Sequence, residues 1–172
     1  MTKSLLGAAI AALVLLPMIS HAADPERQAE VARRGPDVMP FSLKATTHVF
    51  TKTADGGVQR VVTKSAADSR QVRLVRGHLR EIQAQFLKGD FSGPAHIHGE
   101  EMPGLAQLKA SKPGQLTIDY KDVRGGAELT YRTDDVQLVS ALHAWLDAQL
   151  SDHGADATAD HHGHMHHEMP KQ

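Results

Sequence analysis

The stretch TTHVFTKTADGGVQRVVTK, residues 46–64, decides the fold of this chain. Its two ends, 46–52 and 58–64, are rich in β-branched residues, and the first alternates in the manner of a strand. Gly56 and Gly57 lie between these ends and supply the chemistry of a turn. The stretch therefore predicts a β-hairpin.

A helix is expected to follow this hairpin. Asp68 is suited to be its N-cap, and Gly89 marks its end. Its apolar residues recur every three or four positions along one face: Val72, Val75, Leu79, Ile82 and Phe86. This period is that of an amphipathic helix with one face turned to a core.

The same order of elements returns in the second half of the chain. Residues 115–121, QLTIDYK, and 127–133, AELTYRT, predict another hairpin. A second helix is expected to begin near Asp134 or Asp135 and to run to about Ser151. The chain thus carries two ββα units in succession.

The two halves, 46–89 and 115–151, also match in sequence. An offset of 64 positions aligns the helices with seven matches over fifteen positions, and an offset of 69 places Gly56-Gly57 on Gly125-Gly126. A duplicated ββα unit predicts the α+β class, with a four-stranded antiparallel sheet and two helices on one face.

Strand alternation assigns side chains to the two faces of this sheet. Alternate apolar residues mark the helix side of the third strand: Leu116, Ile118 and Tyr120. The offset of 69 puts three residues of the first strand on that side as well: Thr47, Val49 and Thr51. His48 and Phe50 would then point to the uncovered side. Its expected cover is the segment 39–41, the linker 90–114 or a second subunit in a homodimer.

The N-terminus reads as a secretory signal peptide, residues 1–22. Lys3 precedes an apolar run from Leu5 to Ile19 that is shorter than a membrane span. Ser20-His21-Ala22 then supplies a small-x-small cleavage site. We therefore expect a periplasmic or secreted protein with no integral membrane segment after cleavage.

The mature chain is expected to hold one domain, because about 110 residues remain between two irregular ends. Residues 23–39 read as irregular, 40–153 as the α+β domain, and 154–172 as a disordered tail rich in His and Met. The chain contains no cysteine, which excludes disulfides and thiolate metal sites. Its formal net charge is −1 and its basic residues form no block, so nucleic acid is not expected as a partner.

The tail segment 161–169, HHGHMHHEM, is the strongest chemical signal in the sequence. Five of its residues are metal-ligand candidates: His161, His162, His164, His166 and His167. Imidazole binds Cu, Zn and Ni, and the thioethers of Met165 and Met169 favour Cu(I). The expected cofactor is therefore a transition metal ion, with copper favoured and zinc as the second choice.

His96 and His98 form an HxH pair in the linker, a spacing that recurs among metal ligands. In an extended stretch both side chains project to the same side, and three following residues could complete a site: Glu100, Glu101 and Met102. If the linker crosses the open sheet face, His48 joins the pair in a three-nitrogen site for Cu(II) or Zn(II). A polar loop with solvated histidines is an equally good interpretation.

Two more histidines lie on the predicted helices. His78 is at the edge of the apolar stripe of the first helix and is a further ligand candidate. His143 lies within the stripe of the second helix, where a hydrogen-bonded structural role is expected. Both would be on the helix side of the sheet, away from His48.

Four segments carry a resemblance: MPFSLKATTHVFTKTADGGVQ, QVRLVRGHLREI, GPAHIHGEEMPGL and GGAELTYRTDD. They resemble a group of small exported bacterial proteins, some of which carry the label aspartate carbamoyltransferase. The resemblance spans about Met39 to Gly154 and implies no particular reaction. The Ser-Thr-Arg-Thr-Arg loop and the His-Pro-x-Gln segment of carbamoyltransferases are absent, so no catalytic residue is assigned.

Three functions follow from these observations. The first is a periplasmic transition-metal binding protein for metal handling or tolerance, with copper favoured. The second is a metal-dependent periplasmic enzyme, a hydrolase or lyase with Glu100 as general base, although no HExxH or GxSxG motif occurs. The third is a protein-interaction module without metal that pairs through the open sheet face.

Overall fold

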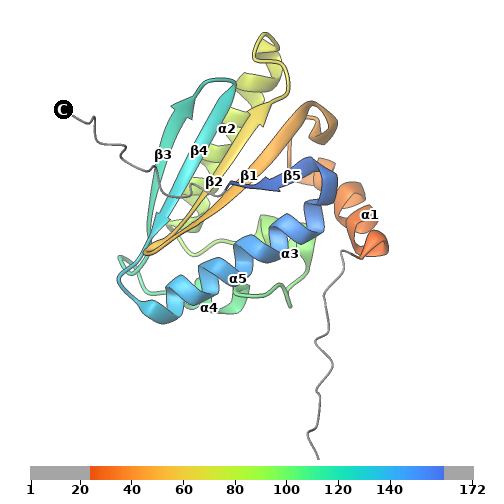
Figure 1. Ribbon diagram of the computed structural model, residues 1–172. Helices are drawn as coiled ribbons and strands as arrows, with labels where there is room; N and C mark the ends of the chain where they lie inside the picture. The colour runs from red at the N-terminus through yellow and green to blue at the C-terminus, as the bar shows by residue number, and fades with distance from the viewer. Residues whose placement is uncertain (1–23, 161–172) are drawn as a thin grey trace, which may run out of the picture.

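A computed structural model describes residues 24–160, which form an α+β domain with one mixed sheet (Figure 1). The strands are β1 (Thr46–Thr53), β2 (Gly56–Thr63), β3 (Thr117–Val123), β4 (Gly126–Arg132) and β5 (Ala157–Ala159). The helices are α1 (Pro25–Arg34), α2 (Ser69–Phe86), α3 (Ser92–His98), α4 (Leu105–Lys109) and α5 (Val136–His153). Short 3-10 turns are η1 (Gly35–Asp37), η2 (Leu43–Ala45) and η3 (Gly154–Asp156).

The sheet has the strand order β3-β4-β2-β1-β5, and β5 runs parallel to β1 while the other neighbours are antiparallel. The α+β class is confirmed, but the four-stranded antiparallel sheet is wrong because a fifth strand joins β1. Residues 154–160, assigned above to the tail, turn at Gly154 and supply this strand. The small side chains of Ala-Thr-Ala carry no apolar alternation from which a strand could be predicted.

Each half of the domain is a hairpin followed by a helix of 18 residues. The helices α2 and α5 begin directly after Asp68 and Asp135, whose carboxylates accept hydrogen bonds from first-turn amides. Such caps satisfy amides that lack a partner within the helix. The inner strands of the two halves pair in the middle of the sheet, where Gln59 lies opposite Leu129. The predicted ββα order is thus present in both halves.

The side chains of β1 that point to the helices are not the predicted ones. Its buried residues alternate: Thr46, His48 and Phe50. The hairpins correspond at Gly56 and Gly126, the first residues of β2 and β4, which gives an offset of 70 and not 69. A slip of one residue reverses every side chain of a strand. Three residues assigned to the helix side are therefore on the other face: Thr47, Val49 and Thr51. Leu116 and Ile118 are buried as predicted.

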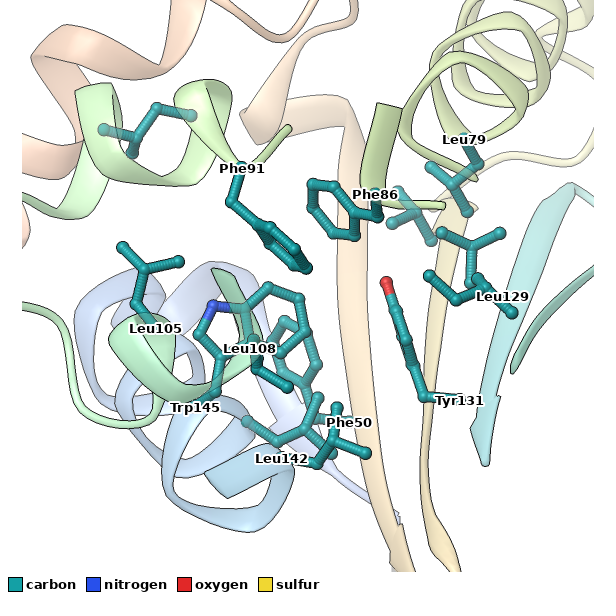
Figure 2. Packing of buried hydrophobic residues seen from close by; sticks show 14 of the residues in the cluster. Phe50, Leu79, Phe86, Phe91, Leu105, Leu108, Leu129, Tyr131, Leu142 and Trp145 are labelled. Atoms are coloured by element: carbon teal, nitrogen blue, oxygen red, sulfur yellow. The ribbon is translucent and has the colours of Figure 1, made fainter. Parts of the chain in front are cut away.

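The core lies between the sheet and the inner faces of α2 and α5. Phe86 of α2 stacks on Phe91 with ring centres 4.2 Å apart (Figure 2). Trp145 of α5 meets Phe86 and Tyr131 edge to face, with ring centres 5.9 and 5.6 Å apart. Aromatic pairs prefer these geometries and add to the stabilisation from burial. Side chains from α2, α5 and β4 thus share one core.

The two segments expected to cover the open face lie on the helix side instead. Met39 and Phe41 are buried in the core described above. The linker 90–114 folds into α3 and α4, and Leu105 and Leu108 of α4 are fully buried. Apolar side chains from both segments thus extend the core rather than form a second layer.

Helix α1 occupies a segment that was predicted to be irregular. Asp24 caps it, Pro25 is its first residue, and Val31 is its buried apolar residue. Pro at the first helical position fits because the missing amide would have no partner there. With so few apolar residues the segment has no periodic signal, and its packing against α5 and α3 places it on the domain.

The other face of the sheet carries ion pairs between neighbouring strands. Arg60 of β2 pairs with Glu128 of β4, and Arg132 of β4 pairs with Asp119 of β3. Opposite charges on adjacent strands give a small stabilisation and suit a face in contact with water. The homodimer through this face stays a prediction. No helix within residues 24–160 is both long and apolar enough to cross a membrane.

Gly104 allows the linker to pass close to α5. Its φ is +79°, and a Cβ at this position would lie 2.1 Å from the carbonyl oxygen of Ala141. Gly89 has a φ of +77° but no atom within 4 Å of such a Cβ. We predict that Gly89→Ala lowers the free energy of unfolding by about 1 kcal/mol, the cost of a left-handed backbone.

We predict that Gly104→Ala lowers the same free energy by about 3 kcal/mol or more, because α5 must also move away. Urea unfolding of the two variants measures the difference. Equal losses would contradict the close packing of Gly104 against α5.

Candidate histidine site

Four of the six histidines between residues 24 and 160 are buried and come together on the helix side of the sheet. They are His48 of β1, His78 of α2, His98 of α3 and His153 of α5, and are called here the histidine cluster. The rings of His48 and His153 stack, with centres 4.6 Å apart and planes 7° from parallel. His98 meets His153 edge on at 5.2 Å.

Phe41 connects the fourth histidine to this group. Its ring centre is 5.9 Å from that of His48 and 5.5 Å from that of His78. Phe50 contacts both His48 and His153 from the strand. The cluster is therefore an aromatic assembly at one end of the core rather than a set of solvated side chains.

The HxH pair of the linker does not act as a pair. Both residues lie in the helix α3, where positions two apart point to roughly opposite sides. His96 is on the surface, with Nε2 3.0 Å from Oδ2 of Asp37, whereas His98 is buried. The extended linker predicted above is thus wrong. Pro94 lies within the first turn of α3, where proline is compatible with a helix.

His98 is held by an ionised carboxylate. Its Nδ1 lies 2.8 Å from Oδ2 of Asp152, and Asp152 accepts two hydrogen bonds from Arg27, from Nε at 3.1 Å and from Nη2 at 2.8 Å. Burial alone would raise the pKa of Asp152, but the hydrogen bonds from His98 and Arg27 outweigh it and lower the pKa to about 2. An ionised carboxylate can only accept hydrogen bonds, so Nδ1 of His98 must carry a proton and donate it to Asp152.

Arg27 joins three helices through this network. Its guanidinium bonds Asp152 at the end of α5, and it also donates from Nη2 to the carbonyl of His98 in α3. The hydrogen bond with Asp152 raises the pKa of Arg27 further above its ordinary range. The helix α1, which contributes Arg27, thereby fixes the position of His98 within the cluster.

His48 has one nitrogen without a hydrogen-bond partner. Burial, with a smaller effect of the neighbouring His78 and His98, lowers its pKa to about 4, so the ring is neutral at pH 7. A hydrogen bond with the backbone of Asp156 raises the pKa, which means that the ring donates it. Nδ1 is buried and has no partner. Because a neutral imidazole has one donor and one acceptor nitrogen, Nδ1 is a bare acceptor.

The other buried rings are also poor bases. Burial lowers the pKa of His78 to about 4 and lowers the pKa of His153 well below its ordinary value, with His48 and His98 adding to the effect on His153. Neutral imidazole is the form that binds transition metals. The environment thus holds these rings ready as nitrogen donors at neutral pH.

His143 has the structural role that was expected for it. Its Nε2 lies 2.9 Å from both the carbonyl oxygen of Thr53 and that of Gly56. The ring N–H donates to two carbonyls at the turn between β1 and β2. His143 therefore ties α5 to the hairpin and is separate from the histidine cluster.

No three His, Asp or Glu side chains among residues 24–160 are already arranged to hold a metal ion. The stacking of His48 on His153 explains part of this result. Imidazole lone pairs lie in the ring planes, and because these two planes are nearly parallel, the two lone pairs do not point at a common ion. The predicted convergence of His48, His96 and His98 on the open sheet face is wrong. His48 and His98 both contact His153 on the other face, where Phe41 connects His78 to His48, and His96 is not part of this group.

Sequence reasoning missed three residues of this site: His153, Asp152 and Arg27. The second helix was ended at Ser151, two residues before its last one. His153 follows Gln149 by four positions and Leu146 by seven, so an extension of the apolar stripe would have found it. Arg27 had no such signal, since its contact joins positions 125 apart in the chain.

The tail histidines 161–167 and the predicted signal peptide, residues 1–22, lie outside the described residues. Comparison of the chain with protein-family models, with curated proteins and with solved structures finds no match in any of the three. The function is therefore argued from the chemistry of the histidine cluster.

The ion pair of Asp152 predicts a loss of stability in acid. Because its pKa is about 2 in the folded protein and near 4 in the unfolded chain, its contribution is complete above pH 4 and is lost as the pH falls through about 2. We expect Asp152→Asn to cost about 2 kcal/mol at pH 7 and little at pH 2. Asp147→Asn, at an exposed ion pair with Lys52, is the control and should cost under about 0.5 kcal/mol. Chemical denaturation across this pH range measures both, and a cost for Asp152→Asn that does not change with pH would contradict the assignment.

The neutral histidines predict a second loss of stability in acid, at less acidic pH. His48 and His78 have a pKa of about 4 when folded and near 6.5 when unfolded, so the unfolded chain binds more protons between these values. Stability should then fall as the pH drops from 6.5 to 4, by up to about 3 kcal/mol for each ring.

We expect His48→Phe to make this slope shallower. Phe50→Leu disturbs the same packing but removes no titrating group, so it should lower stability and leave the slope unchanged. Equal slopes in the wild type and in His48→Phe would show that His48 is not buried as a neutral ring.

Proposed function

We propose that the protein is an exported transition-metal-binding protein that serves in metal handling or tolerance, with copper favoured and zinc the second choice. The bare Nδ1 of the buried, neutral His48 ring, which lies among three other buried histidines, is the observation that carries the proposal. A buried acceptor without a donor costs about 1–3 kcal/mol, and a bound metal ion would remove that cost.

The partners of two rings support this function. Metal-ligating histidines commonly donate their second nitrogen to a carboxylate or a backbone carbonyl, which fixes the tautomer. His98 donates from Nδ1 to Asp152, and His48 donates to the backbone of Asp156. In a neutral ring the nitrogen that does not donate keeps its lone pair. That nitrogen is Nε2 in His98 and Nδ1 in His48, and each could bind a metal ion.

Metal binding requires a side-chain movement within the cluster. His153 must leave its stack on His48 before its lone pair can point at the same ion, because stacked rings do not share a ligand position. A change of its side-chain torsions between staggered wells supplies such a movement. Three nitrogens with one free position then suit Zn(II) or Cu(II).

The tail adds donors of a second kind. It holds five histidines together with Met165 and Met169, and its thioethers favour Cu(I). A ligand-rich segment tethered to a folded site raises the local concentration of captured ions without itself needing to be selective. We assign selectivity to the cluster and collection to the tail.

A metal-dependent enzyme is the second candidate, and one observation favours it. His98, Asp152 and Arg27 line a surface pocket of about 740 Å³ together with Glu100 and Glu101. Pockets of this size accommodate small molecules. An imidazole oriented by a carboxylate can serve as a general base, so a hydrolase or lyase activity would be centred on His98. A protein-interaction module without metal is the remaining alternative.

We predict that a chain ending at Asp160 binds one Cu(II) or Zn(II) ion with micromolar or tighter affinity in isothermal titration. The full chain should bind more ions, since it retains the tail. His48→Phe should remove the single site of the shorter chain because it removes the bare nitrogen, whereas the surface variant His96→Asn should keep it. Complete loss of binding on deletion of residues 161–172 would assign the metal to the tail alone.

Metal content separates the remaining alternatives. The protein should carry Cu or Zn when it is purified without a metal-affinity column and analysed by elemental mass spectrometry. Metal-free protein that also fails to bind added ions would favour the interaction module.

A further inference from the structure

The histidine cluster is closed to solvent in the structure described here. His48 is 2% exposed, His98 3% and His153 9%. A hydrated ion therefore cannot reach the bare Nδ1 of His48 unless some covering segment moves. The question of which segment moves rests on the proposed function, because it concerns access to that site.

Residues 154–160 are the weakest cover of the cluster. None of their side chains is buried, whereas α2 and α5 are each anchored by several buried apolar residues. The backbone of the segment is held by the three residue pairs between β5 and β1 and by the bond from the amide of Asp160 to the carbonyl of Phe50, and Ala157 is its one apolar side chain packed, partly buried, against the core. Its ion pair between Asp156 and Lys64, at 3.6 Å, is solvent-accessible and contributes little. Segments with few buried contacts open at low free energy.

The same segment lies directly on the bare histidine. Ala157 is the register partner of His48 in the sheet, and the backbone of Asp156 accepts the hydrogen bond from the His48 ring. The segment begins just after His153, whose ring stacks on His48. Its place at the edge of the sheet, beside β1 and at the end of α5, is visible in Figure 1. Release of the segment would uncover His48 and free His153 together.

We infer that residues 154–160 form a releasable strap that controls the access of metal ions to His48 and His153. Gly154 is its pivot, because a φ of +51° suits glycine and a Cβ there would lie 2.6 Å from the side chain of Gln28. The strap leads directly into residues 161–172, which hold the tail histidines in the sequence.

Access from the opposite side is less favourable. The surface pocket reaches the cluster at His98, but there the Arg27–Asp152–His98 network would have to separate. Breaking a partly buried ion pair leaves an uncompensated charge and is costly. Release of the strap breaks the three-residue pairing with β1, the hydrogen bond from the His48 ring and an exposed ion pair, and it leaves no buried charge without a partner.

A disulfide can pin the strap, and the absence of native cysteine makes the experiment clean. Val49 and Thr158 are register partners between β1 and β5. Adjacent strands are about 4.8 Å apart, which is within the Cα separation that a disulfide spans. The full-length double variant Val49→Cys, Thr158→Cys is compared in its oxidised form and in a form reduced and capped with iodoacetamide, which has the same substitutions without the bond.

Zn(II) alone is the probe, and the ¹⁵N resonance of His48 Nδ1 reports its arrival at the cluster without interference from the tail. Release of Zn(II) to excess chelator after rapid mixing gives the rate. We expect the oxidised form to release and take up cluster Zn(II) at least tenfold more slowly than the capped form, with the same final occupancy. The exchange of the Asp160 amide with deuterium should slow in parallel.

A second variant acts in the opposite direction and covers the case in which the double variant does not fold. Asp160→Pro removes the amide that bonds the carbonyl of Phe50, so Zn(II) exchange at His48 should be at least threefold faster than in the wild type. Equal rates of Zn(II) exchange in the oxidised double variant, the capped double variant and Asp160→Pro would contradict the strap. That result would leave the proposed metal site intact. Failure of Zn(II) to shift the His48 resonance in every form would overturn the proposed function, and the strap as a control of metal access with it.

Discussion

The sheet buries one face only, and this constraint determines where each histidine of the domain lies. Because side chains alternate along β1, the burial of Phe50 takes His48 into the same core. A single imidazole in an apolar core becomes neutral rather than paying for a buried charge. A neutral ring has one N–H, and that of His48 donates a hydrogen bond to the backbone of Asp156. Its other nitrogen, Nδ1, therefore keeps an unpaired lone pair. The neutral, partly unpaired state of His48 is thus a consequence of its position on the buried face of β1.

The carboxylate in direct contact with the cluster is compensated on both sides. Asp152 has Arg27 on one side and His98 on the other, so its negative charge does not act on the remaining rings as an isolated charge. This separation allows one end of α5 to carry both an ionised carboxylate and, at the next residue, a neutral buried imidazole. The carboxylate orients the ring of His98, while the neutral rings of His48 and His153 keep their lone pairs.

The regular parts of the fold could be predicted from local sequence. The stripe of α2, the aspartate caps of both long helices and the two hairpins all have signals within a few residues, and all are present. The wrong face was predicted for β1 because its orientation was inferred from the other half of the chain. The two halves were aligned on their paired glycines rather than on the first residue after each turn. One position of offset was enough to send His48 to the wrong face.

The rest of the site depends on contacts for which the sequence holds no local pattern. Arg27 lies in a helix that has one buried apolar residue, and its partner Asp152 is 125 positions away. The HxH pair illustrates the converse problem, because a pattern of two residues has different meanings in a strand and in a helix. Only the conformation of residues 92–98 decided that His96 is exposed and His98 is buried.

The parallel strand β5 also has a consequence for how this protein meets other chains. It occupies the outer edge of β1, while at the far edge the side chains of Arg76 and Gln83 bond the β3 carbonyls of Val123 and Ile118. Unpaired edges invite strand addition from neighbouring molecules. Detachment of β5 would expose the backbone of the longer strand β1 as a template, so the inferred strap would limit self-association as well as access to the histidines.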